Sequence, residues 1–425
     1  MNSRMNFPGW LILGLIFLPL CAPAADWPQW RGPDRTAHVP TSEPVPTALA
    51  AEPKILWHIK VGFGLSSPVV ADGKVFYSDD QSGEETLHAI KASDGAELWS
   101  AAIDKSRGDN QSAPGPRCTP TADGPLVFAQ SVGGELRCFK TSDGSAVWSV
   151  NYPKDFGAND FVGENGPSEG AALHGYAGAP VVDSANLYAA VGGTKGESVV
   201  CFEKTTGKVN WKSQNDEAAY AAPIVTSIGG VRQLVHFTAD GVIGLDLGDG
   251  KLLWRSPPMK TSSARHVTTP VVSDDLVVVA SYQIGLVAVK VSRNGSDWQA
   301  AETWTNKYDA MNFSSPVAVG DYLYGLGLSR NFICVEIKTG KLMWSQGGYI
   351  TSAGVNSYAA FVVMGGNVLA LTDGGELVLF AADPKGFKEI SRVQVCGKTW
   401  CYPAYAEGKL FLRDARELMC VGLMP

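Results

Sequence analysis

The sequence predicts an all-β fold, an eight-bladed β-propeller in which the N-terminal strand completes the last blade. The first observation behind this prediction is the phrase small-small-Pro, which recurs at intervals of 42 to 60 residues. Its eight copies, the seventh of them degraded, begin at Ser66, Cys118, Gly178, Ala221, Thr268, Ser314, Ala359 and Cys401. Self-similarity with a period of about 40–50 residues is typical of propellers and other repeat folds.

The second observation is a turn that keeps the same period. Asp-Gly or Thr-Gly is followed four residues after the Gly by a tryptophan, in five copies ending at Trp99, Trp148, Trp211, Trp254 and Trp344. Gly supplies the positive φ that a tight hairpin turn needs, and the indole ring can pack against a neighbouring unit. Each repeat therefore predicts four strands, of which the last carries the tryptophan.

The third observation is the incomplete final repeat. The eighth unit has three predicted strands, whereas the segment 54–59 (KILWHI) precedes the first unit with no strand of its own to pair with. We expect this N-terminal strand to complete blade eight, because closure removes the unpaired edges of an open array. The predicted propeller domain covers residues 55–425.

Composition agrees with a large β-rich domain and argues against one class of partner. The 425 residues are 45% hydrophobic and 18% charged, and they include 47 Gly and 25 Pro. No segment shows the 3.6-residue apolar period of an amphipathic helix, whereas short β-branched runs are frequent. The net charge is −7 without a basic, aromatic-rich stretch, so nucleic acid is not an expected partner.

Residues 1–25 are predicted to be a secretory signal peptide. Arg4 precedes an apolar run of 11 residues, Trp10–Leu20, and small residues follow, with cleavage expected at Ala24 or Ala25. The mature protein is therefore expected in the periplasm or outside the cell, without a transmembrane segment. A lipid anchor at Cys21 is disfavoured because the residues before it are bulky.

Residues 26–54 are predicted to form a Pro-rich lead-in strap without regular strands. We expect Trp27, Trp30 and Arg31 to pack this strap against the first or last blade. Contact with a partner is the alternative.

The repeats resemble those of the pyrroloquinoline-quinone-type (PQQ-type) propellers. The motifs that carry the resemblance are SDGAELW, TSDGSAVW, KTTGKVNW, LGDGKLLW and IKTGKLMW, spread over nearly the whole mature chain. This superfamily includes quinoprotein alcohol dehydrogenases and the propeller lipoprotein of the outer-membrane β-barrel assembly machinery. The resemblance implies the fold strongly and the function weakly, because one such fold hosts enzymes and scaffolds alike.

An enzyme of this superfamily would hold the quinone between a tryptophan and a ring formed by two adjacent cysteines, with a calcium ion on carboxylate and amide oxygens. This sequence has no adjacent cysteine pair and no C-x-x-C-H haem motif. We therefore expect no cofactor, and PQQ with calcium only if the protein is a quinone-dependent dehydrogenase.

The cysteines and histidines of the mature chain are expected to have structural roles, without metal binding or catalysis. Cys138, Cys201 and Cys334 each stand six residues before a turn Gly, and Cys420 takes the matching place in blade eight, so we expect buried packing thiols. A disulfide between Cys396 and Cys401 is left open. The six histidines show no metal-binding spacing, so no metal site is predicted.

The long connection 151–177 departs most from the repeat. Its acidic residues are Asp155, Asp160, Glu164 and Glu169, without a defined ligand spacing. A solvated cover loop is preferred over a calcium site.

The candidate ligand site lies in the residues just before each small-small-Pro phrase. These positions enter the innermost strands and should converge at one mouth of the central channel, although channel-filling side chains are the alternative. The candidates are Arg117, Tyr176, Tyr220, Arg265, His266, Asn312, Tyr358, Lys398 and Trp400. We expect the two arginines to hold an anionic group, Tyr220 and Trp400 to supply flat apolar faces, and His266 to tune binding with pH.

The sequence thus predicts an exported, monomeric binding or scaffold module without catalytic activity, whose partner is an unknown small molecule or an envelope protein. One alternative is a quinone-dependent dehydrogenase of an alcohol or sugar. Another is a component of an outer-membrane protein assembly complex.

Overall fold

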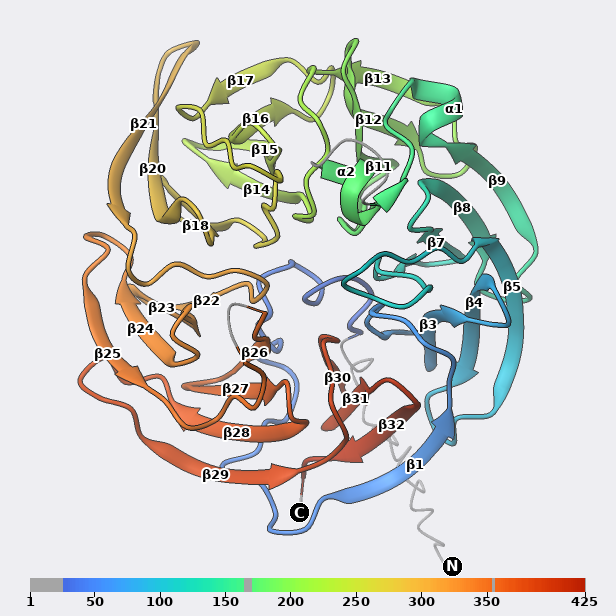
Figure 1. Cartoon of the computed structure of the whole chain (residues 1–425), viewed down its shortest axis with the longest axis vertical. Helices are drawn as coiled ribbons and strands as arrows, with labels where there is room; N and C mark the ends of the chain where they lie inside the picture. Colours follow the sequence, from blue (N-terminus) through green and yellow to red (C-terminus); the bar gives the residue numbers. More distant parts are fainter. Residues whose placement is uncertain (1–25, 164–169, 354–355, 425) are drawn as a thin grey trace, which may run out of the picture.

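Eight four-stranded antiparallel sheets surround a central axis in the computed structural model, which describes residues 26–163, 170–353 and 356–424 (Figure 1). The predicted all-β, eight-bladed propeller is therefore confirmed. The predicted signal peptide, residues 1–25, lies outside the described residues. Within the described ranges, no helix is both long enough and apolar enough to cross a membrane.

Each blade contributes one strand to each of four concentric positions. The innermost strands are β2 (Val69–Ala71), β6 (Thr121–Asp123), β10 (Val181–Asp183), β14 (Ile224–Ile228), β18 (Val271–Ser273), β22 (Val317–Val319), β26 (Ala359–Met364) and β30 (Ala404–Ala406). The second strands are β3 (Lys74–Asp80), β7 (Leu126–Gln130), β11 (Asn186–Gly193), β15 (Val231–Phe237), β19 (Leu276–Ser281), β23 (Tyr322–Leu326), β27 (Asn367–Thr372) and β31 (Lys409–Arg413). The third strands are β4 (Glu84–Lys91), β8 (Glu135–Lys140), β12 (Glu197–Glu203), β16 (Val242–Asp246), β20 (Gly285–Asn294), β24 (Phe332–Glu336), β28 (Glu376–Ala381) and β32 (Glu417–Gly422).

The outermost strands carry the repeat tryptophans, except β29 of blade seven, which has none. They are β5 (Glu97–Lys105), β9 (Ala146–Asn151), β13 (Val209–Ser213), β17 (Leu252–Arg255), β21 (Asp297–Asn306), β25 (Leu342–Gln346), β29 (Glu389–Gln394) and β1 (Lys54–Lys60). Two short helices, α1 (Tyr152–Phe156) and α2 (Gly170–His174), lie in the long connection between blades two and three.

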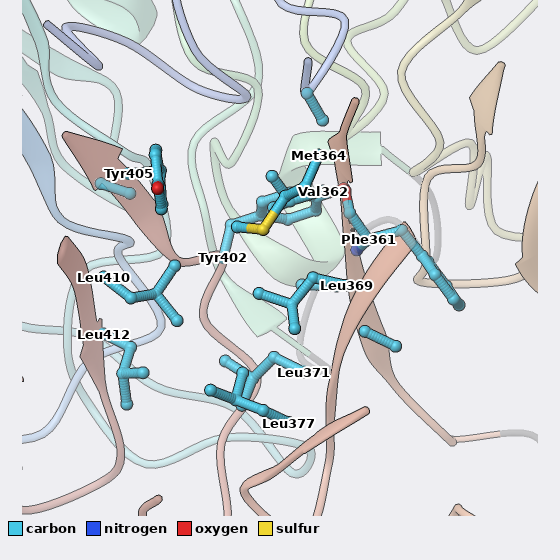
Figure 2. Packing of buried hydrophobic residues seen from close by; sticks show 14 of the residues in the cluster. Phe361, Val362, Met364, Leu369, Leu371, Leu377, Tyr402, Tyr405, Leu410 and Leu412 are labelled. Atoms are coloured by element: carbon cyan, nitrogen blue, oxygen red, sulfur yellow. Dashed lines mark hydrogen bonds between the residues drawn. The ribbon is translucent and has the colours of Figure 1, made fainter. Parts of the chain in front are cut away.

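The ring closes as the sequence predicts. Strand β1 pairs antiparallel with β32, so blade eight has the order β1-β32-β31-β30 and joins the two ends of the chain. The closing strand begins at Lys54, and its Trp57 lies opposite Cys420. Figure 2 shows the packing beside this closure, where Leu369 and Leu371 of blade seven lie near Leu410 and Leu412 of blade eight in one core cluster.

Neighbouring blades are joined by the repeat tryptophans. In six places the indole Nε1–H of one blade donates to a backbone carbonyl of the next blade, at 2.8–3.1 Å. The pairs are Trp57–Ala92, Trp99–Thr141, Trp148–Lys204, Trp211–Leu247, Trp304–Ile337 and Trp344–Asp383. In five of the six pairs, a turn Gly of the next blade lies against the same ring. A Cβ added at Gly207, for example, would stand 2.6 Å from Cδ2 of Trp148.

The predicted packing thiols fill a position opposite these rings. Cys138, Cys201 and Cys334 pair across strands with Trp148, Trp211 and Trp344, and all three thiols are fully buried. Burial raises the pKa of the Cys201 thiol to about 12. A small residue is needed at this position because the indole ring covers it.

The strap differs from the prediction that it packs on the first or last blade. It crosses the central axis and makes polar contacts with the inner part of every blade (Figure 1). In blade order the contacts are Trp27–Val70, Pro28–Ala122, Arg35–Ala179, Arg35–Pro223, Trp30–Thr269, Arg31–Pro316, Val39–Val363 and Pro44–Tyr405. The strap therefore closes one end of the central channel.

Buried arginines hold the strap in place. Arg35 is 2% exposed, and its guanidinium donates to the carbonyls of Ala179, Pro180 and Pro223 and to the side-chain oxygen of Gln29. Arg31 is 1% exposed and donates to the carbonyl of Pro316 at 2.5 Å. These contacts use carbonyls that the small-small-Pro phrases present at the axis.

The packing of the turn glycine against the tryptophan ring can be tested with two glycines that share a backbone conformation. Gly207 has φ +72° and lies against Trp148, whereas Gly230 has φ +74° and a Cβ there would meet no atom within 4 Å. We expect Gly230→Ala to cost about 1 kcal/mol, the penalty for a left-handed backbone. Gly207→Ala should cost about 2–4 kcal/mol, because steric overlap with the ring is added. Chemical denaturation measures both, and equal losses would contradict this packing.

Candidate functional site

A cavity of about 780 Å³ lies on the propeller axis and reaches the closing strap. Its wall includes a residue from the entrance to the innermost strand of every blade. These residues are Leu65, Thr119, Ala179, Tyr220, Val267, Phe313, Tyr358 and Trp400, in blade order. Only the closed ring brings these positions together.

Six of the nine candidate residues line this cavity: Arg117, Tyr220, Arg265, Tyr358, Lys398 and Trp400. The other three do not. Tyr176 is buried, and its hydroxyl donates to Asn159 O at 2.7 Å.

His266 and Asn312 are buried beside residues that line the cavity. The His266 ring stacks on Phe237 with centroids 4.1 Å apart, and its Nδ1 lies 2.7 Å from Thr238 O. Burial lowers the pKa of His266 to about 4, so the ring is mostly neutral between pH 5 and 8, where it was expected to tune binding. Asn312 is 4% exposed. In both cases the adjacent residue, Arg265 or Phe313, reaches the cavity instead.

Trp30 of the strap forms part of the cavity wall. Its Nε1–H donates to Thr269 Oγ1 at 2.8 Å, and its ring meets Tyr402 edge to face at 4.9 Å. The strap therefore supplies both a plug for the channel and an aromatic surface inside the cavity.

A buried polar cluster stands on one side of the cavity. The Asp109 carboxylate is fully buried, and its Oδ2 accepts from Arg117 Nη1 and from His174 Nδ1, both at 2.8 Å. Arg117 Nη1 also donates to His174 O at 2.5 Å. On the far side of the imidazole, His174 Nε2 lies 3.1 Å from Gln111 Nε2 and 3.3 Å from Arg265 Nη2.

The protonation states in this cluster follow from these contacts. Burial would raise the pKa of Asp109, but the hydrogen bonds from Arg117 and His174 outweigh it and lower that pKa to about 2. Burial lowers the pKa of His174, and although the hydrogen bond and the charge of Asp109 raise it, the positive charges of Arg265 and Arg117 act with burial and the pKa stays below its ordinary value. Neutral His174 carries its proton on Nδ1, facing Asp109, so Nε2 is an acceptor on the side of Arg265.

Some nitrogens of the two guanidinium groups have no hydrogen-bond acceptor among the described residues. Arg117 Nε and Nη2 and Arg265 Nε are buried, and no described residue accepts a hydrogen bond from them. The Arg265 guanidinium lies over the rings of Tyr282 and Phe313, at 5.5 and 5.8 Å from their centroids. Buried N–H groups without acceptors are costly, so these nitrogens lower the stability that the cluster contributes.

The rest of the wall is aromatic. The Trp400 ring lies 4.9 Å from Phe313 and 5.8 Å from Tyr358, with which it is stacked at 18°. Because Arg265 lies over Phe313, the cationic and aromatic parts of the wall are continuous.

A nearby carboxyl group does not cancel the positive charge. Glu85 is fully buried and accepts from Val132 N. Burial raises its pKa to about 8, so Glu85 is mostly protonated at pH 7.

The protonation of Glu85 can be tested through the dependence of the protein's stability on pH. The folded state keeps the proton up to about pH 8, whereas the unfolded chain releases it above the ordinary value of 4.5, so this group makes stability fall as pH rises between these values. We expect Glu85→Gln to reduce that fall by a few kcal/mol at most, on the order that such a shift permits. Thermal melts from pH 5 to 9 measure it, with exposed Glu84→Gln as the matched control. A slope unchanged in Glu85→Gln would contradict the assignment.

The described residues do not fit the calcium–quinone arrangement of the dehydrogenases. Asp414 is the one acidic residue among those lining the cavity, and its carboxylate accepts from the backbone N–H groups of Gly397, Arg416 and Glu417. Across residues 26–163, 170–353 and 356–424, no three His, Cys, Asp or Glu side chains come together to hold a metal ion. Cys401 also lines the cavity, as a free thiol.

The structure also bears on the Cys396–Cys401 disulfide and on the acidic residues of the connection 151–177. Cys396 and Cys401 are free thiols in the structure. In the long connection, Asp155 accepts from Asn151 N, Asp160 pairs with Arg107, and Glu164 and Glu169 lie outside the described residues.

Sequence reasoning did not place Asp109, His174 or Trp30 among the candidates for the axial site, although it named Trp30 as a packing residue of the strap. None of the three precedes a small-small-Pro phrase. The length of the connection 151–177 was a usable signal for His174, because long loops on rigid scaffolds often carry function.

The fold and the cavity define a class: a single-chain, eight-bladed β-propeller with an axial pocket closed by its own N-terminal strap. A family model described as "Outer membrane protein assembly factor BamB" matches residues 43–159 and 168–364, more than half of the chain. The chain belongs to this family, which is a PQQ-type propeller family. A comparison with curated protein sequences finds no match.

Solved structures share the fold at low sequence identity. BamB from Moraxella catarrhalis is 12% identical with a TM-score of 0.56, over 87% of this chain and 99% of that one. A quinohemoprotein alcohol dehydrogenase from Pseudomonas putida HK5 is 10% identical with a TM-score of 0.63, over 94% of this chain and 80% of that one. The C-terminal WD40 domain of Sif2 is 10% identical with a TM-score of 0.52, over 89% of this chain and all of that one.

Proposed function

We propose that this protein is an exported binding module that holds a small molecule in its axial cavity and catalyses no reaction on it. The observation that carries the proposal is the convergence of all eight blades on one cavity of about 780 Å³, within the size range of small-molecule sites. Its wall combines several aromatic rings with a few polar groups, which is the usual composition of a ligand pocket.

Aromatic stacking in the cavity provides the test of this function. A thermal-shift screen of small molecules against the purified protein should yield ligands whose stabilisation is lost in Trp400→Ala. Trp298→Ala is the matched control, because Trp298 stands on the outer hairpin of blade five, where it contacts Arg293. The absence of any stabilising ligand would contradict the proposal, and so would ligands that bind Trp400→Ala as well as the parent.

Export rests on the N-terminal sequence. We expect the protein to leave the cytoplasm and to begin at Ala25 or Asp26 after cleavage, as a monomer because the ring closes within one chain. Osmotic-shock fractionation followed by intact mass measurement checks this. Recovery of the uncleaved chain in the cytoplasm would overturn it.

The family match supports a second candidate, a component of an outer-membrane protein assembly complex that binds protein at its rim. Its envelope partner would be retained by Trp400→Ala in a pull-down experiment, whereas small-molecule binding would not.

The fold similarity to a quinohemoprotein alcohol dehydrogenase favours a quinone-dependent dehydrogenase as the third candidate. The donor set around the cavity does not support that chemistry.

A further inference from the structure

We propose that the imidazole of His88 is a pH-sensitive latch at the interface where the propeller closes, so that closure is firm while the imidazole carries both protons and loosens when one is lost. This interface, which we call the closing seam, lies between blade one (β2–β5) and blade eight (β30–β32 with the closing strand β1). The inference concerns the closure of the fold and does not depend on a ligand in the axial cavity.

The imidazole of His88 is hydrogen-bonded to carboxylates on both nitrogens. His88 lies in β4 and is buried, with Nε2 3.0 Å from Asp79 Oδ1 and Nδ1 3.1 Å from Glu97 Oε2. The Asp79 side chain is fully buried, whereas the Glu97 side chain is 56% exposed. Because a carboxylate only accepts hydrogen bonds, both nitrogens donate and the imidazole carries a positive charge.

The charged and titratable groups around the imidazole come from three strands. Asp79 and Tyr77 lie on β3, and Glu97 lies on β5. Tyr77 stacks on the imidazole with centroids 4.8 Å apart and packs in the core cluster shared with blade eight, where the charge of Arg413 on β31 acts on it. Burial would lower the pKa of His88, but the hydrogen bonds and charges of Asp79 and Glu97 outweigh it and raise that pKa above its ordinary value of 6.5.

Asp79 connects the imidazole to the segment that leads from the closing strand into blade one. Its Oδ2 accepts from the backbone N–H of Gly62 at 2.7 Å, two residues after β1 ends. The carbonyl of Gly62 accepts from Arg413 Nη2 at 2.7 Å, and Arg413 Nη1 donates to Ser78 O at 2.8 Å. Blade one, the end of the closing strand and blade eight are therefore joined at Gly62.

Loss of one proton from the imidazole weakens this junction. The neutral imidazole can donate to Asp79 or to Glu97, but not to both. In either case the buried carboxylate of Asp79 loses its cationic partner and keeps the donors Gly62 and Gln81. An unpaired buried charge is strongly destabilising, so the closing strand is held less firmly. Because the pKa is raised, the stabilisation is complete below pH 6.5 and is lost as pH rises through the raised value.

The same segment forms part of the wall of the axial cavity. Phe63, Gly64 and Leu65 directly follow Gly62 and line the cavity. Phe63 is also held by blade one, because its carbonyl accepts from Asp80 N at 2.7 Å. Loosening at Gly62 therefore acts on residues of the cavity wall, and we expect residues 61–65 to respond to pH together with the closing strand.

Hydrogen exchange of the full chain, followed by mass spectrometry from pH 5.5 to 8.5, tests the latch. After correction for the intrinsic dependence of exchange on pH, protection of residues 54–65 and 417–422 should fall about tenfold relative to β19 and β20 of blade five. His88→Gln, which cannot be protonated, should remove this difference, whereas His58→Gln should keep it. His58 is the matched control because it lies on β1 in the same seam, where it is 62% exposed and pairs with Glu417.

The titration of His88 is a second measurement. NMR of the full chain with labelled histidine should show an imidazole that titrates above pH 6.5 and that is missing in His88→Gln. Glu97→Gln should lower that midpoint and move the loss of protection to lower pH. Because Glu97 is half-exposed on an outermost strand, this variant should fold even if His88→Gln does not. Glu85→Gln should leave the difference between the seam and blade five in place, since Glu85 accepts from Val132 of blade two.

The parent protein alone can overturn the proposal. Protection of the closing seam that follows blade five at every pH would do so, and so would a His88 imidazole that titrates at or below pH 6.5. Loss of the pH effect in His58→Gln, with the effect kept in His88→Gln, would assign the response to the exposed pair His58–Glu417 and would also contradict the latch.

Discussion

The hydrogen bond from a tryptophan indole to a backbone carbonyl of the next blade is the interaction on which the ring depends. It occurs in six places, and in five of them a turn Gly of the next blade lies against the same ring. The geometry explains two features of the repeat. A glycine is required in the turn because any Cβ would enter the indole, and a small residue such as Cys201 is required on the neighbouring strand because the indole covers it. The spacing of four residues between glycine and tryptophan is thus part of the joint between blades.

The strap closes one end of the central channel of this ring. A propeller axis presents backbone carbonyls that no strand pairs with, and buried carbonyls need donors. Arg35 satisfies carbonyls of blades three and four with one guanidinium, and Arg31 bonds to blade six. Because the guanidinium carries five N–H donors in a rigid plane, a single arginine can join separate blades where a lysine could not. Trp30, which directly precedes Arg31 in sequence, forms part of the wall of the cavity.

The cavity brings together two different environments. One side is a buried ion-pair cluster in which Asp109 orients both Arg117 and His174. The other is a stacked aromatic surface around Trp400. Asp109 accepts from one nitrogen of Arg117 and so holds the guanidinium in position. The protonated Glu85 keeps the local charge positive without the cost of a second buried carboxylate.

The sequence alone determined the repeat, the number of blades and the closure by the segment at Lys54–Lys60, because these follow from local turn chemistry and from a fixed period. It also placed six of the nine candidate residues on the cavity, since a shared position in the repeat becomes a shared position around the axis. Tertiary structure decided the rest. Which of two adjacent residues faces the cavity, Arg265 or His266, depends on loop conformation that no periodicity encodes. The strap and the connection bearing His174 lie outside the repeat, so their contacts across the axis arise only from long-range packing and from the buried arginine hydrogen bonds that hold them.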